Sequence, residues 1–290
     1  MNQMIAATNA ATSSPVHRRT IKPGFAVEIS GIDLRTASAD IQDEIVALYK
    51  QHSAMVIRDQ NLTPSELLAF SAKIGPIVAQ SREEQTHPDH PAISVLSNKV
   101  ENGKLIGVHW NGLGWHTDGT YLPKPLISTI LYGVETPPEG GDTLVADTCA
   151  AFYALPPERQ AFLEGLEVLH SFSYLADKQA QKGRVPATED QKATFPDRTH
   201  PLVMTHAQNG RKSFYLTSGT TKAIVGMEDE EQGRQLVGEL IKFVTQEEFV
   251  YRHKWRQGDI LIWNDLYTMH TATLYDDKAY DRLMYRVWLD

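Results

Sequence analysis

The second half of the chain consists largely of short runs of β-branched and aromatic residues, and this pattern constrains the fold more than any other feature. Several such runs, separated by turn-forming residues, are typical of an antiparallel sandwich or barrel. A polar-faced helix, predicted over residues 228–243, interrupts the series. The predicted strands cover residues 128–134, 143–146, 201–205, 213–217, 260–263 and 283–289.

Strand and helix signals alternate before that region. Residues 25–34 alternate as a strand does, residues 41–49 carry apolar side chains at helical spacing, and residues 54–57 form a short apolar run. Residues 63–66 read Thr-Pro-Ser-Glu, which combines a hydroxyl cap, a proline at the first helical position and a capping glutamate. This predicts a helix that continues to about Lys73.

The chain of 290 residues has no internal repeat and no obvious linker between domains. We predict a flexible tail over residues 1–19 and one domain over residues 20–290, mainly β with helical decoration. The tail ends in Arg18-Arg19 and carries no acid, so a mitochondrial transit peptide is an alternative. The polar stretch 178–198 suits a mobile loop or a lid.

The overall charge argues for a small-molecule partner. A net charge of -8 and a pI near 5.8 are unfavourable for nucleic-acid binding, which depends on clustered cations. A single cysteine, Cys149, excludes an internal disulfide and fits a reducing compartment, and we expect a cytoplasmic protein. No run approaches the roughly 20 apolar residues of a membrane-spanning helix, so no membrane partner is expected.

The tetrapeptide Trp115-His116-Thr117-Asp118 carries the clearest chemical signal. On an extended segment alternate side chains leave on one face, so His116 and Asp118 can point at the same ion. A third ligand, a neutral imidazole, would complete a two-histidine, one-carboxylate arrangement. That arrangement leaves positions open on iron(II) for a cosubstrate and oxygen.

Several motifs in order along the chain make it resemble the family of taurine dioxygenase and 2,4-dichlorophenoxyacetate dioxygenase. The order and spacing of the motifs match over roughly residues 20–290. They are Gly31-Ile32-Asp33-Leu34, Trp115-His116-Thr117-Asp118, Gly140-Gly141-Asp142-Thr143, His200-Pro201-Leu202-Val203, Gly258-Asp259-Ile260-Leu261-Ile262-Trp263, His270, and Arg282-x-x-x-Arg286.

This resemblance implies a double-stranded β-helix core, also called a cupin-like jelly roll, with His116 and Asp118 following one strand and His270 on another. It implies that these three residues hold Fe(II) and that Thr143 and Arg282 bind the distal carboxylate of 2-oxoglutarate (α-ketoglutarate). The implied reaction consumes O2, releases succinate and CO2, and hydroxylates or otherwise oxidises a C–H bond. The outcome beyond hydroxylation depends on how the substrate lies.

Chemistry supports the arginine assignment, because a guanidinium stays charged and offers paired donors that match a carboxylate. In a strand, Arg282 and Arg286 lie on one face and reach the same cavity. Arg286 is then free for a carboxylate or sulfonate on the substrate. The alternative for Arg286 is a salt bridge with Asp281 or Asp290.

Further substrate contacts are expected from His109 and Asn111, which precede the metal motif in a glycine-containing loop. Taurine itself is not expected, since Gln80 stands near the place of a sulfonate-binding histidine in taurine dioxygenase. The family's Trp-Asp-Asn run is Trp263-Asn264-Asp265 here.

Two other functions fit the same ligands. One is a redox-neutral, zinc-dependent hydrolase or isomerase on a jelly roll, which needs neither Thr143 nor Arg282. The other is a binding protein without catalytic activity. Assembly into a homo-oligomer is possible in each case.

Overall fold

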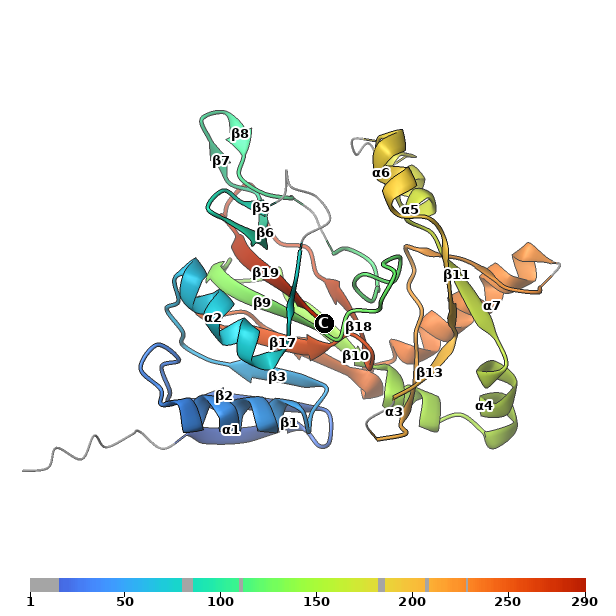
Figure 1. The fold of residues 1–290 in the computed structure, drawn as a ribbon, viewed down its shortest axis with the longest axis horizontal. Helices are drawn as coiled ribbons and strands as arrows, with labels where there is room; N and C mark the ends of the chain where they lie inside the picture. Colours follow the sequence, from blue (N-terminus) through green and yellow to red (C-terminus); the bar gives the residue numbers. More distant parts are fainter. Residues whose placement is uncertain (1–15, 80–85, 110–111, 182–185, 207–208, 228) are drawn as a thin grey trace, which may run out of the picture.

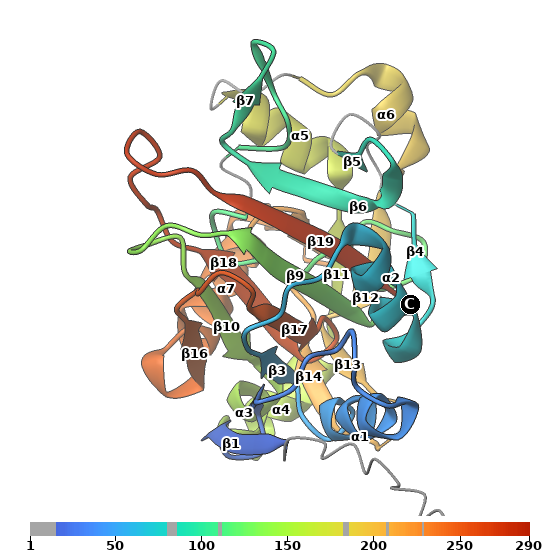
Figure 2. The same cartoon turned by 90° about the vertical axis from the view of Figure 1, so that its left-hand side faces the viewer.

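The structure is a computed structural model that describes residues 16–79, 86–109, 112–181, 186–206, 209–227 and 229–290. Its largest element is a mixed sheet in which β2 and β3 are parallel and the other pairs are antiparallel (Figures 1 and 2). In spatial order its strands are β1 (His17–Lys22), β2 (Ala26–Ser30), β3 (Ala54–Ile57), β17 (Ile260–Asn264), β9 (Ser128–Glu135), β19 (Leu283–Leu289), β6 (His90–Ser97) and β5 (Thr86–His87), with β4 (Ile77–Val78) pairing β19.

A second, smaller sheet packs against the large one. It has the order β16 (Val250–His253), β10 (Thr143–Asp147) and β18 (Thr268–Ala272). Val145 of β10 packs in one core with Leu131 of β9 and Met284 of β19. The two layers and their antiparallel pairing confirm the predicted jelly-roll core.

The large sheet is covered on both faces, and apolar residues follow one another along β3 and the first four positions of β17. Ile260 and Ile262 of β17 pack into one core, whereas Leu261 and Trp263 pack into the core shared with the small sheet. This is the two-residue period expected of a strand. Such continuous apolar runs are expected where both faces of a sheet are covered.

Two N-terminal helices cover the outer face of the large sheet (Figure 1). They are α1 (Ala39–Tyr49) and α2 (Pro64–Ile74). The capping box predicted at Thr63 is present, with its side chain accepting from the backbone N–H of Glu66 and the Glu66 carboxylate accepting from the backbone N–H of Thr63. The N-terminal helix and strand predictions are therefore confirmed, with small shifts of their ends.

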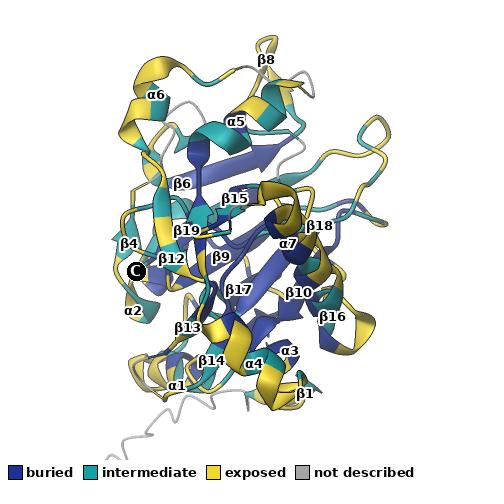
Figure 3. Cartoon of the chain, turned by 90° about the vertical axis from the view of Figure 1, so that its right-hand side faces the viewer, coloured by how far each residue is buried: buried dark blue, intermediate teal, exposed yellow. Residues whose placement is uncertain are grey.

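The chain between β10 and β16 leaves the two sheets and builds a third hydrophobic core (Figures 1 and 3). Its amphipathic helix α7 is buried along one side and exposed along the other. The segment contains α3 (Thr148–Tyr153), α4 (Pro157–Glu164), β11 (Glu167–His170), α5 (Phe172–Gln181), α6 (Glu189–Thr194), β12 (Arg198–Pro201), β13 (Val203–Thr205), β14 (Lys212–Phe214), β15 (Thr221–Ile224), α7 (Glu230–Val244) and the 3-10 helix η2 (Glu247–Phe249). A small hairpin, β7 (Val100–Glu101) and β8 (Lys104–Leu105), lies outside it.

Three sequence predictions are corrected. The stretch 178–198 is not a single loop, because it contains the end of α5 and the whole of α6. The strand predicted over residues 213–217 ends at Phe214, since Thr217 turns to donate its backbone N–H to the Thr221 hydroxyl. The predicted tail is also shorter, because β1 begins at His17.

No helix in the described part of the chain combines the length and the apolar character needed to cross a membrane.

Candidate active site

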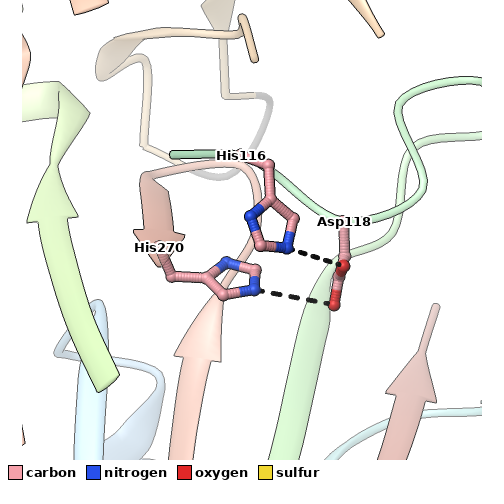
Figure 4. A group of neighbouring side chains, drawn as sticks. All are labelled: His116, Asp118 and His270. Atoms are coloured by element: carbon pink, nitrogen blue, oxygen red, sulfur yellow. Dashed lines mark ion pairs between the residues drawn. The ribbon is translucent and has the colours of Figure 1, made fainter. Parts of the chain in front are cut away.

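Three side chains from two distant parts of the chain, residues 116–118 and strand β18, meet at one place (Figure 4). One possible ligand atom from each of His116, Asp118 and His270 lies within 4.8 Å of those of the other two. The Nε2 atom of His116 lies 3.7 Å from Asp118 Oδ1, and that of His270 lies 3.9 Å from Asp118 Oδ2. Two nitrogen atoms and one carboxylate thus face a common point.

Backbone pairing produces this arrangement. His116 and His270 form an isolated antiparallel bridge, with N···O distances of 2.9 Å and 2.7 Å between their backbones. Directly paired residues place their side chains on the same side, so the two imidazoles lie together, with ring centres 4.1 Å apart. Asp118 follows two residues after His116 and reaches the same side.

Each histidine is prepared to act as a ligand. The Nδ1 of His116 lies 2.8 Å from the Gly114 carbonyl oxygen, so it donates its proton there and leaves Nε2 with a free lone pair. Burial, followed by the neighbouring His116, lowers the pKa of His270 well below its usual value. His270 is therefore neutral, which is the form that binds a metal.

The Asp118 carboxylate is held from several directions. Trp288 Nε1 donates to Oδ2 over 3.0 Å, and the Thr129 hydroxyl donates to the same oxygen over 3.2 Å. Burial alone would raise the pKa of Asp118, but the Arg286 guanidinium, with Nη1 3.6 Å from Oδ1, holds that pKa well below its usual range. Asp118 is thus ionised and oriented before any metal binds.

A second buried carboxyl group, Asp265, lies behind Asp118. Asp265 Oδ2 lies 2.7 Å from the Thr129 hydroxyl oxygen, and Asp265 Oδ1 accepts from Trp263 Nε1 over 3.1 Å. Burial and then the charge of Asp118 raise the pKa of Asp265 well above its usual value. Asp265 therefore keeps its proton while Asp118 is negative, and the Thr129 hydroxyl links the two groups.

Thr143 and Arg282 line one cavity with both histidines. Among the described residues, no acidic side chain lies within 4.0 Å of the Arg282 guanidinium, and its Nε has no hydrogen-bond partner. Burial lowers the pKa of Arg282 to about 10, so the side chain still carries its charge near neutral pH. A buried cation without a counterion is unfavourable unless a ligand supplies the anion.

That cavity fits the cosubstrate expected from the sequence. Thr143 and Arg282 in its lining are donors of the kind a carboxylate requires, and the same lining includes the two histidines. Gly141 borders it with a φ of +64°, and an added Cβ there would lie 3.4 Å from Arg282 Nε. A side chain at position 141 would be strained and would crowd the guanidinium.

A larger pocket has both His116 and Asp118 in its lining, and we call it the substrate pocket. Its walls include one face of α5, which contributes Phe172, Leu175 and Gln179 at helical spacing. The other lining residues are Val108, Gly112, Leu113, Gly114, His116, Thr117, Asp118, Gly119, Tyr121, Thr217, Ser218, Gly219, Thr220, Arg286 and Trp288.

Arg286 lines both cavities. Its guanidinium carbon lies 4.5 Å from the centre of the Trp288 ring, and its Nε has no hydrogen-bond partner in the described structure. The acids considered as alternative partners, Asp281 and Asp290, face lysines instead. Arg286 is close to Asp118, and it keeps donors for an anion in the substrate pocket.

The other two residues predicted to contact the substrate are His109 and Asn111. His109 lines a small cavity beside Arg282, and its Nε2 lies 3.0 Å from Asp277 Oδ2. It is not among the residues that line the substrate pocket. Asn111 lies outside the described residues.

Comparison with known proteins gives the family. The model of the taurine catabolism dioxygenase TauD, TfdA family matches residues 17–288. The chain belongs to the TauD/TfdA family.

Curated relatives and solved structures agree with this membership over nearly the whole chain. The α-ketoglutarate-dependent 2,4-dichlorophenoxyacetate dioxygenase of Cupriavidus pinatubonensis is 32% identical over 97% of this chain and 98% of its own. The pentalenolactone F synthase of Streptomyces arenae is 30% identical over 84% of this chain and 85% of its own. The crystal structure of AAD-2 in complex with Mn(II) and N-oxalylglycine is 29% identical, covers 95% of this chain and 97% of its own, and has a TM-score of 0.77.

The TauD/TfdA chain is thus an α-ketoglutarate-dependent dioxygenase, and the family uses Fe(II), 2-oxoglutarate and O2. The predicted family, fold, reaction class and cofactors are confirmed. The roles of individual residues stay predictions, which the geometry above supports.

Sequence reasoning missed the residues that support the ligands. Thr129, Trp255, Asp265 and Trp288 hydrogen-bond to predicted site residues. Alternation along 283–289 could have indicated Trp288, because it lies two residues after Arg286 on the same strand face. No local pattern marks Trp255, which comes after β16 has ended.

Proposed function

We propose that His116, Asp118 and His270 hold iron(II), and that Thr143 and Arg282 bind the distal carboxylate of 2-oxoglutarate. In this proposal the enzyme oxidises a C–H bond of a small organic anion bound in the substrate pocket. The observation that carries the cosubstrate assignment is the buried, unpaired guanidinium of Arg282 in a cavity that also reaches both histidines. Neither a zinc hydrolase nor a simple binding protein needs such a group.

Bound iron(II) with 2-oxoglutarate supplies the oxidative chemistry, in which O2 is consumed, succinate and CO2 are released, and one oxygen atom enters the substrate. The chain supplies binding, orientation and exclusion of water. His116 and His270 offer neutral nitrogen atoms, and Asp118 offers an ionised oxygen held by Trp288. Because the three ligands come from one side, the opposite side is open to cosubstrate and substrate.

The two cavities separate the roles of the two organic molecules. The smaller one has the hydrogen-bond donors Thr143 and Arg282 in its lining and suits a dicarboxylate. The substrate pocket has apolar walls in Phe172 and Leu175, and Arg286 is the one Lys or Arg among the described residues that line it. A molecule with an apolar body and one carboxylate or sulfonate matches that distribution of charge.

The names of the relatives support this substrate class. They include an (S)-phenoxypropionate/α-ketoglutarate dioxygenase of Sphingobium herbicidovorans and an α-ketoglutarate-dependent sulfonate dioxygenase of Saccharomyces cerevisiae. In this chain Arg286 would bind the anionic group and place a neighbouring C–H bond beside the metal ligands. His109 is a weaker candidate for substrate contact, because its ring is paired with Asp277.

The proposal is tested by measuring succinate released under O2 with a panel of small carboxylates, sulfonates and acylated amino acids. We expect substrate-dependent succinate that requires both iron(II) and 2-oxoglutarate. In Arg286→Ala the best substrate should no longer stimulate succinate release, while 2-oxoglutarate still binds. Anaerobic addition of iron(II) and 2-oxoglutarate should give a weak metal-to-ligand absorption band, and its absence in folded protein would contradict the proposed site.

Three wider aspects belong to the same proposal. Residues 20–290 act as one unit, since β2 near the start and β19 at the end lie in one sheet. The buried free thiol of Cys149 supports a reducing, cytoplasmic location, which cell fractionation tests. Assembly into a homo-oligomer stays a prediction, for which sedimentation velocity is the measurement.

A further inference from the structure

The Thr143 hydroxyl is hydrogen-bonded to Trp255, which is not among the residues that line the cosubstrate cavity. Trp255 Nε1 donates to Thr143 Oγ1 over 3.1 Å, and both residues are buried, with 3% and 7% of their surfaces exposed. Among the described residues, Thr143 Oγ1 has no second hydrogen-bond partner. The hydroxyl is therefore half satisfied.

The donor and acceptor properties of the two groups determine what the hydroxyl can do next. An indole N–H can only donate, whereas a hydroxyl carries one hydrogen and two acceptor positions. Thr143 Oγ1 must therefore accept from Trp255, and its own hydrogen is left for a different partner. In a cavity shared with Arg282, that partner is an anion.

We propose that Trp255 is a positioning residue for the cosubstrate: its N–H commits the Thr143 hydroxyl to donate to the distal carboxylate of 2-oxoglutarate. The inference rests on the proposed function, because it requires Thr143 and Arg282 to bind that carboxylate. It adds a residue that touches neither metal nor cosubstrate and acts only through Thr143.

The surroundings keep the indole in place. Its ring meets the His253 ring edge-on, with centres 4.4 Å apart and planes at 89°. His253 in turn lies between the Tyr251 hydroxyl, 3.0 Å from Nδ1, and the Asp259 carboxylate, 3.3 Å from Nε2. Backbone pairing of Thr143 with His253 fixes the spacing between the strand that carries the hydroxyl and the strand that leads to the indole.

Loss of the N–H should affect one end of the cosubstrate only. In Trp255→Phe the ring still packs, but the Thr143 hydroxyl has no donor behind it and can turn its hydrogen away from the cavity. A hydrogen bond to a charged group is then lost for part of the time, which corresponds to about a tenfold weaker binding. The keto-acid end, which faces the metal ligands, is unaffected.

The experiment measures binding by calorimetry to the full chain loaded with Mn(II), so that no turnover is needed. The probes are 2-oxoglutarate and 2-oxobutyrate, which has the same keto-acid end and no distal carboxylate. We expect Trp255→Phe to raise the Kd of 2-oxoglutarate about tenfold and to leave that of 2-oxobutyrate unchanged. Thr143→Val should show the same selectivity, and the double variant should bind no more weakly than Thr143→Val alone.

Tyr132→Phe is the matched control, because it removes a buried hydroxyl and its hydrogen bonds in the core on the other face of the large sheet and leaves the indole N–H and its neighbours intact; its Kd for 2-oxoglutarate should stay at the wild-type value. Equal losses for both probes in Trp255→Phe, no loss for 2-oxoglutarate, or additive effects in the double variant would overturn the inference. If Thr143→Val and Arg282→Met also bind 2-oxoglutarate normally, the proposed cosubstrate site itself is wrong.

A second measurement covers the case in which Trp255→Phe does not fold. In protein labelled with 15N-tryptophan, Thr143→Val should shift one indole N–H resonance, and 2-oxoglutarate should shift the same resonance in the wild type. Absence of a common resonance in the two experiments would also overturn the inference.

Discussion

Replacing Arg282 by methionine should stabilise the protein when no cosubstrate is present. Its guanidinium is buried without an acid in the described structure, and burial lowers its pKa to about 10. A shift of that size corresponds to a destabilisation of the folded, charged form on the order of 3 kcal/mol. Methionine fills similar space without charge, so we expect Arg282→Met to be about 2 kcal/mol more stable.

The gain should not depend on pH in the usual range. Below about pH 10 the guanidinium is protonated in both the folded and the unfolded chain, so folding neither takes up nor releases its proton. The unfavourable burial of charge is therefore constant between about pH 6 and 9. It is relieved only above about pH 10, where the folded wild type loses that proton and the unfolded chain still holds it.

Thermal unfolding without 2-oxoglutarate tests the expected stabilisation by Arg282→Met. Thermal unfolding with 2-oxoglutarate tests whether the ligand stabilises the wild type more than the variant. Without 2-oxoglutarate, we expect the Tm of Arg282→Met to lie about 3 °C above that of the wild type. With metal and 2-oxoglutarate at about 100 times Kd, the wild type alone should gain about 2.7 kcal/mol. Arg234→Met, at an exposed arginine paired with helix glutamates, should change Tm little. The reasoning is refuted if Arg282→Met is the less stable protein without ligand, or if ligand stabilises both proteins equally.

Three further outcomes are expected. Trp288→Phe removes the indole donor to Asp118, so the affinity for Mn(II) should fall about tenfold in a metal titration, and an unchanged affinity would contradict the role given to that bond. Leu175→Trp narrows the substrate pocket, so the KM of the best substrate should rise while the Kd of 2-oxoglutarate stays the same, and a parallel rise in both would show that the cavities are not separate. Burial lowers the pKa of His170 to about 3, so stability is full above about pH 6.5 and falls as the unfolded chain takes up a proton at lower pH. His170→Gln should reduce the slope of unfolding free energy against pH by about one proton in urea titrations between about pH 4 and 6, and an unchanged slope would contradict this.

Elements with strong local signals could be predicted from the sequence. The capping box at Thr63 sets the start of α2 through contacts within four residues, and the apolar run of β17 needs no distant partner to be recognised. The helices α5 and α6 were not predicted, because contacts with distant residues, rather than a local sequence pattern, stabilise them. Phe195, just after α6, packs against Phe172 of α5 and against Tyr121 from another region.

The candidate site shows the same division. His116, Asp118 and His270 stand in motifs whose order and spacing can be read along the chain. Trp288 and Asp118 are 170 positions apart, and their hydrogen bond exists only because β19, which carries Trp288, lies beside the segment that carries Asp118. Residues of this kind become visible when strand neighbours are known, since no pattern within one segment contains both partners.

The segment between β10 and β16 contributes residues of α5 and residues 217–220 to the substrate pocket, but none of its described residues lines the cavity of Thr143 and Arg282. During evolution this segment could therefore change without disturbing the cosubstrate cavity. Divergence of substrate preference within such a family would then be concentrated in one insertion, while the sheets that carry the metal ligands stay under constant selection. Relatives with about 30% identity, one named for 2,4-dichlorophenoxyacetate and another for pentalenolactone F, are what such a separation of the two cavities would produce.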